Sequence, residues 1–222
     1  MISSLGSERQ ALASAQEDIE GQLRAGMVGL GLEFAGDAAY MLAQYLRLLA
    51  RWNEAFNLTG RSSLKDMVAR HVLDSLTALP YLAGTAVLDV GTGAGLPGIP
   101  LAVLDPHRHY TLLDSKGKKT RFVTQAIGEL GLDNVDVVRA RVEAFAPQQR
   151  FDTVITRAFS SLTRFVQKCR HLTAAGSRLV ALKGRYPDEE LKSVLRAVTA
   201  VNVLPVQVPG LDAERHVVII EP

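Results

Sequence analysis

The amino-acid sequence predicts an α/β fold, in which a helical cap precedes a seven-stranded, mostly parallel sheet that ends in an antiparallel hairpin. Three observations support this prediction. Residues before 86 show the apolar spacing of helices, residues after 85 alternate between short apolar runs and helical stretches, and the last two runs are joined by a turn too short for a helix. We therefore expect a cap over residues 1–85 and a sheet domain over residues 86–222.

The cap is predicted from two amphipathic stripes. In the first, apolar side chains recur at steps of three and four, the spacing of one helix face; they are Met41, Leu42, Tyr45, Leu46, Leu49 and Trp52. The second stripe consists of Val68, Val72, Leu76 and Leu79. Pro80 follows it and fits the end of a helix. Residues 57–63 between the stripes have the composition of a loop.

The sheet domain is predicted from apolar runs separated by helical stretches, because strands that alternate with helices form parallel sheets buried on both faces. The first five runs are Ala86–Val90, Tyr110–Leu113, Val135–Val138, Phe151–Ile155 and Arg178–Leu182. The clearest helical stretches are Lys116–Leu130 and Leu162–Leu172. Two further runs, Val201–Val208 and His216–Ile220, flank a turn and are expected to be antiparallel.

Composition excludes several classes of protein. With 47% apolar and 22% charged residues, the chain is not disordered, collagen-like or a coiled-coil rod. No window approaches a membrane span. The single cysteine excludes an internal disulfide and a cysteine-based zinc site, and we expect no bound metal. The first ten residues lack the pattern of a signal peptide, so we expect a reducing, cytoplasmic location.

Charge is distributed unevenly along the chain. Residues 1–85 carry 7 Lys and Arg against 9 Asp and Glu, whereas residues 86–222 carry 18 against 14. This mild basic bias of the sheet domain permits a polyanionic partner without requiring one.

The clearest candidate site is the glycine-rich turn Gly91–Gly98, which follows the first predicted strand. Ligands bind at the carboxyl ends of strands in such sheets, and glycines let the backbone turn sharply and approach a ligand. The turn matches the dinucleotide fingerprint G-x-G-x-x-G from Gly93 onward, and Asp114 lies where the ribose-binding acid of that fingerprint would lie. A nicotinamide-dependent oxidoreductase is therefore one hypothesis.

The cofactor S-adenosylmethionine fits the same turn better. Asp89 at the end of the strand would repel a pyrophosphate but suits an ammonium or sulfonium group. Pro97 and Pro100 remove backbone N–H donors that an anion would need. Asp114 can accept hydrogen bonds from ribose hydroxyls, and Glu143 after the third strand offers a carboxylate beside the adenine. Three acids at three successive strand ends favour this cofactor over three unrelated helix caps.

Several segments also carry a specific resemblance to a known family. They are Arg51-Trp52-Asn53, Asn57-Leu58-Thr59, His71–Leu76, Asp89–Pro100, Leu112–Ser115 with Lys118-Lys119, Arg141-Val142-Glu143, Arg157-Ala158-Phe159, Ala181–Gly184 and Leu211–His216. In these segments the chain resembles the RsmG (GidB) family, the methyltransferases that place a methyl group on guanine N7 in small-subunit ribosomal RNA. The resemblance covers about residue 35 to the end, and Gly91–Pro100 is its most specific part.

The resemblance implies a Rossmann-like class I methyltransferase fold with S-adenosyl-L-methionine as its cofactor. It implies cofactor-binding positions at Gly91, Leu96, Val142, Glu143 and Arg157, to which the argument from the residues adds Asp89, Gly93 and Asp114. The implied acceptor is one guanine of 16S ribosomal RNA, guanine 527 in the 530 loop. The expected partner is 16S rRNA or an assembling small subunit; we expect no membrane partner and a monomeric enzyme.

Residue types that are missing from the predicted site exclude some classes of methyl-acceptor atom. Pyrimidine C5 methylation commonly needs a cysteine nucleophile, whereas Cys169 lies within a predicted helix and is expected to be a packed apolar side chain. Amino methyltransferases usually show an Asn/Asp-Pro-Pro-aromatic turn after the fourth strand, where this chain has Thr156-Arg157-Ala158-Phe159. Guanine N7 needs neither nucleophile nor base, so we expect catalysis by positioning, with Arg157 contacting cofactor and acceptor. A surface ion pair is the alternative for Arg157.

Basic residues near the strand ends are the candidate RNA contacts. We select Lys118, Lys119, Arg121, Lys183 and Arg185, together with Phe159, which either stacks on a base or packs in the core. His71 and Asp74 lie one helical turn apart; we favour a hydrogen-bonded pair that clamps the cap onto the sheet over a direct RNA contact. A non-catalytic RNA-binding protein with a vestigial pocket is the third hypothesis.

Overall fold

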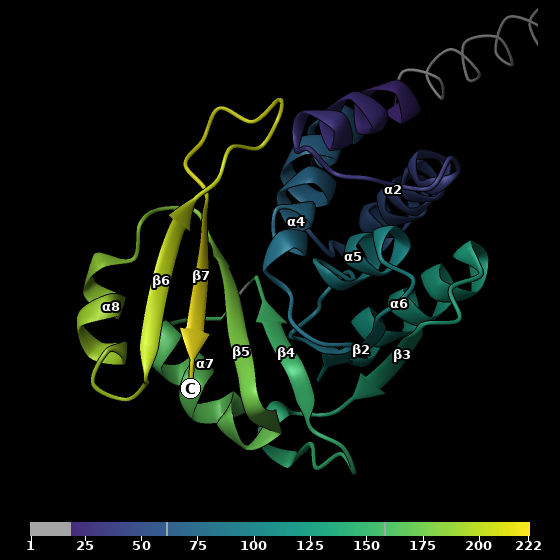
Figure 1. The fold of residues 1–222 in the computed structure, drawn as a ribbon. Helices are drawn as coiled ribbons and strands as arrows, with labels where there is room; N and C mark the ends of the chain where they lie inside the picture. The colour runs from purple at the N-terminus through teal and green to yellow at the C-terminus, as the bar shows by residue number, and fades with distance from the viewer. Residues whose placement is uncertain (1–18, 61, 158) are drawn as a thin grey trace, which may run out of the picture.

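A computed structural model describes residues 19–60, 62–157 and 159–222 (Figure 1). The signal-peptide prediction, which depends on the first ten residues, lies outside this part of the chain. Residues 19–29 are helical. The α-helices after them are α2 (Ala38–Phe56), α3 (Leu64–Met67), α4 (Asp74–Leu76), α5 (Gly98–Leu104), α6 (Gly117–Leu130), α7 (Leu162–Cys169) and α8 (Asp188–Val194). Among the residues described, no helix has the length and apolar character needed to span a bilayer.

Seven strands form a single sheet, as predicted. They are β1 (Ala86–Val90), β2 (His109–Asp114), β3 (Val135–Arg139), β4 (Phe151–Thr156), β5 (Thr173–Lys183), β6 (Ala200–Pro205) and β7 (His216–Glu221), in the order β3-β2-β1-β4-β5-β7-β6. The first five strands are parallel, and β7 lies between β5 and β6, antiparallel to both. The predicted α/β class and the antiparallel final hairpin are confirmed, and the carboxyl ends of β1 to β5 share one edge.

Two strand boundaries differ from the prediction by more than one residue. β5 begins at Thr173, before the expected start at Arg178, and its pairing with β4 shifts register between Phe151 and Thr153. Gly176 has a φ of 75°, so residues 173–177 contain a kink. This segment therefore lacks the continuous apolar run from which strands are predicted. β6 ends at Pro205 instead of Val208.

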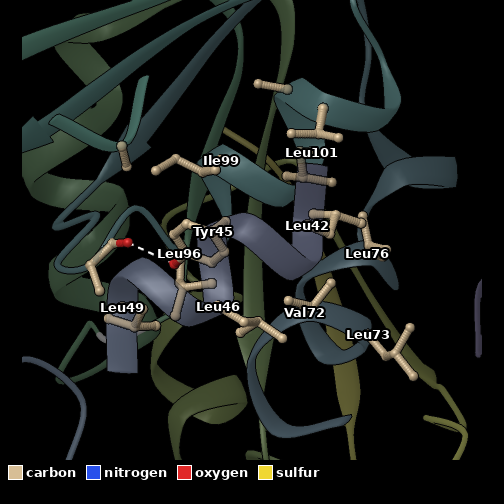
Figure 2. Packing of buried hydrophobic residues seen from close by; sticks show 14 of the residues in the cluster. Leu42, Tyr45, Leu46, Leu49, Val72, Leu73, Leu76, Leu96, Ile99 and Leu101 are labelled. Carbon is tan, nitrogen blue, oxygen red and sulfur yellow. Dashed lines mark hydrogen bonds between the residues drawn. The ribbon is translucent and has the colours of Figure 1, made fainter. Parts of the chain in front are cut away.

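The sheet is buried on both faces by two separate cores. Alternate residues of β1 divide between them, because successive side chains of a strand point to opposite faces: Val87 joins one core and Leu88 the other. The first core contains the predicted stripes of the cap, and Figure 2 shows Leu42, Leu46 and Val72 within it. The second core is built around α7 and α8, which pack against each other.

The cap and the sheet share the first core. Leu42 of α2 and Leu76 of α4 are fully buried in the same cluster as Leu112 of β2 and Ile155 of β4. Helix α2 also contacts both α5 and α6 beside the sheet (Figure 1). The boundary at residue 85 therefore separates two sequence patterns that share one core. The division of the chain into two domains at that residue stays a prediction.

The second cap helix is interrupted. Val68–Leu73 forms a π-helical turn between α3 and α4, and 3₁₀ turns occupy Leu79–Tyr81, Val142–Ala144 and Arg170–Leu172. The apolar stripe is still buried, since Val68, Val72 and Leu76 are all below the surface. A π-helical turn is uncommon in helices and often occurs at a functional site. Here it faces the edge of the sheet where β4 ends, because the Arg70 carbonyl accepts a hydrogen bond from Arg157.

Candidate functional site

The glycine turn after β1 has a backbone that only glycines adopt easily. Gly91, Gly93 and Gly95 have φ values of 73°, 62° and 82°. The N–H groups of Gly91 and Thr92 both donate to the Leu113 carbonyl, at 2.8 and 3.1 Å, which joins the turn to the end of β2. A Cβ atom added to Gly91 would meet no other atom within 4 Å. The turn therefore presents bare backbone to open space.

Asp89 lies behind this turn rather than in front of it. The residue is fully buried, and its Oδ2 accepts hydrogen bonds from the Thr92 hydroxyl at 2.6 Å and the Gly98 N–H at 3.0 Å. Burial raises the pKa of Asp89 to about 6, against the opposing effect of these two hydrogen bonds. The structure does not bring Asp89 to a surface that a ligand can reach. Its carboxylate holds the turn from within.

Asp114 at the end of β2 also supports the turn. Its Oδ2 accepts a hydrogen bond from the Gly93 N–H at 3.0 Å, and its Oδ1 accepts one from the Lys116 N–H at 2.8 Å. The Lys119 ammonium lies 3.9 Å from Oδ2. Unlike Asp89, Asp114 also lines a cavity, described next, so it is both an anchor of the turn and a candidate ligand-binding residue.

A cavity of about 310 Å³ opens where β1, β2, β3 and β4 end. Among the predicted cofactor residues it brings together Gly91, Asp114, Val142 and Glu143. Further wall residues are Val90, Leu113, Ser115, Lys116, Lys119, Ala140, Arg141, Phe159 and Lys168. Its wall thus combines bare glycine backbone, apolar side chains and two carboxylates with four cationic side chains. This set of groups fits an adenosyl group, which has an apolar base and a ribose with two hydroxyls to donate.

Glu143 and Phe159 lie on the walls of this cavity with partners of their own. Glu143 is exposed and forms a hydrogen-bonded ion pair with Lys168 of α7, which lowers the pKa of Glu143 below its usual value. The Phe159 ring lies 5.3 Å from the Phe165 ring and is partly buried against the second core. Phe159 therefore packs in the core on one side and borders the cavity on the other.

Arg157 borders a different cavity, next to the first across the end of β4. Its Nη1 donates to the Arg70 carbonyl at 3.3 Å and lies 3.7 Å from Oδ2 of Asp74. Both contacts are with the cap, and the ion pair is made with the buried Asp74 rather than at the surface, where the alternative for Arg157 expected it. The contact between Arg157 and a cofactor stays a prediction.

The predicted pair of His71 and Asp74 is not formed. Asp74 instead accepts a hydrogen bond from Nε of Arg215 at 2.8 Å and lies near Arg157. Burial raises the pKa of Asp74, and these two guanidinium groups oppose the effect. Both ring nitrogens of His71 are buried without a hydrogen-bond partner among the described residues, and burial, followed by Arg157, lowers the pKa of His71 to about 4. Asp74 clamps the cap to the sheet, but through two arginines.

The predicted RNA-binding residues occupy different environments. Lys118 donates to the Phe56 carbonyl at 3.3 Å, and Lys183 is held by both carboxylate oxygens of Glu190 at 2.9 Å. Arg121 and Arg185 are exposed, without an ion pair in the described part of the chain. Lys119 borders the first cavity. Leu96, a predicted cofactor position, is 3% exposed and packs in the first core beneath the turn.

Two side chains that support the turn were not predicted from the sequence. The hydroxyl of Tyr45 in α2 donates to the Ala94 carbonyl at 2.7 Å (Figure 2), and the hydroxyl of Thr156 donates to the Val90 carbonyl at 2.8 Å. Tyr45 was recognised only as part of an apolar stripe. A buried tyrosine hydroxyl usually has a hydrogen-bond partner. The place of Tyr45 in a buried stripe therefore indicates that its hydroxyl is bonded, but it does not identify the partner.

Cys169 is fully buried in the second core, which confirms its prediction as a packed side chain. Burial raises the pKa of its thiol to about 12. A thiol of this kind is inert as a nucleophile at neutral pH.

The fold is that of class I methyltransferases. The glycopeptide N-methyltransferase MtfA complexed with S-adenosyl-L-homocysteine superimposes with a TM-score of 0.58 at 14% identity, over 68% of this chain and 90% of that one. A SAM-dependent methyltransferase from Aquifex aeolicus gives a TM-score of 0.55 at 18% identity, over 71% and 93% of the two chains. Identities this low establish the fold alone.

Sequence comparisons give the family. Residues 39–218 match the GidB family, described as rRNA small subunit methyltransferase G. The ribosomal RNA small subunit methyltransferase G of Laribacter hongkongensis is 48% identical over 201 residues, 90% of this chain and 97% of that protein. The protein of the same name from Chromobacterium violaceum is 50% identical over 198 residues, 89% of this chain and 95% of that protein. The chain belongs to the GidB family, which confirms the predicted resemblance.

Proposed function

We propose that this protein transfers a methyl group from S-adenosyl-L-methionine to N7 of one guanine in 16S ribosomal RNA, guanine 527 in the 530 loop. The observation that carries the proposal is the cavity at the glycine turn, because it joins bare backbone, an apolar wall and the carboxylates of Asp114 and Glu143 in a member of this family. The substrate is 16S rRNA or an assembling small subunit, and the enzyme acts as a cytoplasmic monomer.

The residues of the chain have separate tasks toward the cofactor, which supplies an activated methyl group. Val142 and Leu113 provide an apolar surface for the adenine, and Glu143 and Asp114 accept hydrogen bonds from its polar groups and the ribose. Gly91 allows the backbone to come close. Asp89, Gly93 and Leu96 act from behind or within the turn, by fixing its shape.

The hydrogen bonds of the turn argue against a nicotinamide cofactor. In dinucleotide-binding folds, free N–H groups at the start of the helix hold the pyrophosphate. Here the Gly93 N–H is taken by Asp114 and the Gly98 N–H by Asp89, each at 3.0 Å. The Gly95 and Leu96 N–H groups donate to the Thr92 carbonyl. At the turn itself, a pyrophosphate would find these N–H donors occupied.

The reaction we propose is an in-line transfer without a covalent intermediate. Guanine N7 has a lone pair in the plane of the ring and no proton to lose, so it attacks the methyl carbon directly. The buried Cys169 thiol cannot serve as a nucleophile, and no general base is required. The enzyme then lowers the barrier by holding the reactants in line, which can supply about 7–11 kcal/mol.

Arg157 is the positioning residue in this mechanism. It follows β4 and borders the cavity at the cap, and its ion pair with Asp74 fixes the guanidinium at the junction of cap and sheet. The sulfonium of the cofactor is cationic, so Arg157 acts by hydrogen bonding to guanine O6 or to phosphate. For the RNA we propose contacts with Lys118, Lys119, Arg121, Lys183, Arg185 and Phe159.

Incorporation of tritiated methyl groups tests this function. The wild type with S-adenosylmethionine should label 16S rRNA. In a separate binding measurement it should not bind NAD. Arg157→Ala should abolish or greatly reduce labelling while calorimetry shows how far cofactor affinity changes. Full labelling by Arg157→Ala would remove Arg157 from the mechanism, and absence of labelling by the wild type would reject the function itself.

A further inference from the structure

The second cavity lies between the helical cap and the ends of β4 and β5. We call it the cap cavity; its volume is about 350 Å³, and its polar wall residues are Arg70, His71, Asp74, Arg157, Lys183 and Arg215. The cap contributes the first three of these side chains and the sheet domain the others. The proposed function uses Arg157 and Lys183 but gives no role to the cavity as a whole.

The wall of the cap cavity carries more positive than negative charge. Four cationic side chains face one carboxylate, that of Asp74. Glu190 neutralises Lys183 through two contacts of 2.9 Å, and His71 is neutral near pH 7 because burial lowers its pKa to about 4. Three guanidinium groups therefore surround a single carboxylate, an arrangement that an anion would balance.

Asp74 holds two of these guanidinium groups in fixed positions. It is 6% exposed, and its two oxygens face different arginines: Oδ1 accepts from Nε of Arg215 at 2.8 Å, and Oδ2 lies 3.7 Å from Nη1 of Arg157. The two guanidinium side chains are both 22% exposed, so each is held on one side and open on the other.

Each guanidinium keeps donors without a partner. Arg215 uses Nε on Asp74 and Nη1 on the Glu214 carbonyl, and its Nη2 has no hydrogen bond among the described residues. Within the part of the chain that the structure describes, Arg157 donates only through Nη1, to the Arg70 carbonyl. Arginine presents its N–H groups as a planar fork that matches a phosphate, and two preoriented forks would lose little entropy on binding one.

We propose that the cap cavity binds a backbone phosphate of the substrate RNA, with Arg157 and Arg215 as its ligands and Asp74 as the residue that positions them. The inference rests on the proposed function and deepens it, because this phosphate would belong to the strand that carries the acceptor guanine. Arg70 of the cap adds a third charge at the rim. The cap is thereby a part of the RNA site.

Salt-dependent binding of a 16S rRNA fragment tests the site. For single-stranded RNA, log K falls with log salt by about 0.7 for each phosphate contacted. Arg215→Gln should reduce that slope by about one contact and weaken binding about tenfold, with unchanged affinity for S-adenosylmethionine. Arg215→Lys, which keeps the charge, should restore most of the slope.

Arg196→Gln is the matched control. Arg196 is exposed and lies between α8 and β6, and β6 begins at the opposite edge of the sheet from the one where β5 ends. This variant removes the same charge and should bind RNA with the wild-type slope. An equal loss in Arg196→Gln and Arg215→Gln would mean that net charge, rather than the cap cavity, sets the affinity.

Asp74→Asn separates positioning from charge. If only charge matters, removing the Asp74 carboxylate should tighten RNA binding. If Asp74 orients the guanidinium groups of Arg157 and Arg215, loss of that orientation should weaken RNA binding. Thermal unfolding of each variant excludes a folding defect. Weaker binding by folded Asp74→Asn supports the proposal; tighter binding, or a wild-type slope in Arg215→Gln, overturns it. Methyl incorporation is measured on the same samples. If the wild type binds RNA but does not methylate it, the proposed function is rejected. The phosphate site is then tested independently by the slopes of log K against log salt.

Discussion

Oδ2 of Asp114 accepts a hydrogen bond of 3.0 Å from the Gly93 N–H, which ties the end of β2 to the glycine turn after β1. The two residues have the spacing of a dinucleotide fingerprint, but in that fingerprint the acid binds ribose and the N–H groups face a phosphate. Here the acid accepts from an N–H of the turn, and its remaining lone pairs can still accept from ribose hydroxyls. The carboxylate thus holds the turn in shape and uses a donor that a phosphate would need.

The turn should also depend on the hydroxyl of Tyr45. Tyr45→Phe leaves the buried Ala94 carbonyl without its donor, so the free energy of unfolding should fall by about 1–3 kcal/mol and S-adenosylmethionine should bind more weakly. Chemical denaturation and calorimetry measure the two effects. Tyr110→Phe is the control, because the buried Tyr110 hydroxyl has no partner within the described residues and its removal should cost little. Equal losses in both variants would contradict this role of Tyr45.

The stability of the protein should respond to ionisation of Asp89. Burial raises the pKa of this group from 3.8 to about 6, so the folded state favours the protonated form. This contribution is complete below pH 3.8 and is lost as the pH rises to about 6. Relative to Asp89→Asn, which can still accept from Thr92 and Gly98, the wild type should lose about 3 kcal/mol of unfolding free energy over that range.

Denaturation at several pH values measures this difference. Asp133→Asn, which replaces an exposed carboxyl, controls for the loss of one charge. A constant difference between the wild type and Asp89→Asn across the range would mean that Asp89 has the same pKa in the folded and unfolded protein, so that burial does not raise it.

Glu143→Gln should weaken S-adenosylmethionine binding about tenfold, because the amide offers the cofactor one neutral acceptor in place of a carboxylate. Glu143 borders the cavity, and its ion pair with Lys168 would also be lost. Calorimetry measures the affinity. Glu129→Gln is a suitable control, since Glu129 pairs with Arg51 outside the cavity wall. Wild-type affinity in Glu143→Gln would place the residue outside the cofactor site.

Cys169→Ala should keep methyl transfer activity and lower the free energy of unfolding by about 1 kcal/mol, since it leaves a small void in the second core. Disulfide reagents should not react with Cys169 in the folded wild type, because the thiol is buried and its pKa is raised to about 12. Loss of turnover by a folded, cofactor-binding Cys169→Ala would revive a covalent mechanism.

The sequence was sufficient for most of the fold. Apolar runs such as Ala86–Val90 mark strands because both faces are buried, and the turn before His216 is too short for anything but an antiparallel return. The position of β7 between β5 and β6 depends on pairing across distant segments, which no local pattern encodes. The kinked start of β5 is hidden for the same reason, because Thr173 pairs with Phe151 of β4 and the register then shifts before Arg178.

For the candidate site, the sequence identified which residues lie at the strand ends but not the directions in which their side chains point. Asp89 and Asp114 both lie at the ends of strands. One carboxylate is sealed behind the turn and the other reaches the cavity, and they accept hydrogen bonds from Thr92 and Gly93 respectively. Asp74 showed only a neighbour at helical spacing, whereas its hydrogen-bond donor, Arg215, lies 141 residues further along the chain.

The identity of the methylated atom is the central claim of this account. An N7-methylguanosine carries a fixed positive charge that weakens its imidazole ring, so borohydride reduction followed by aniline cuts the RNA at that nucleotide. The measurement is primer extension across 16S rRNA that has been incubated with the protein and S-adenosylmethionine and then treated in this way. We expect one new cut, in the 530 loop, that is absent or greatly reduced with Arg157→Ala. Methyl groups incorporated into RNA that resists aniline would show that another atom is the acceptor and would contradict the proposed mechanism.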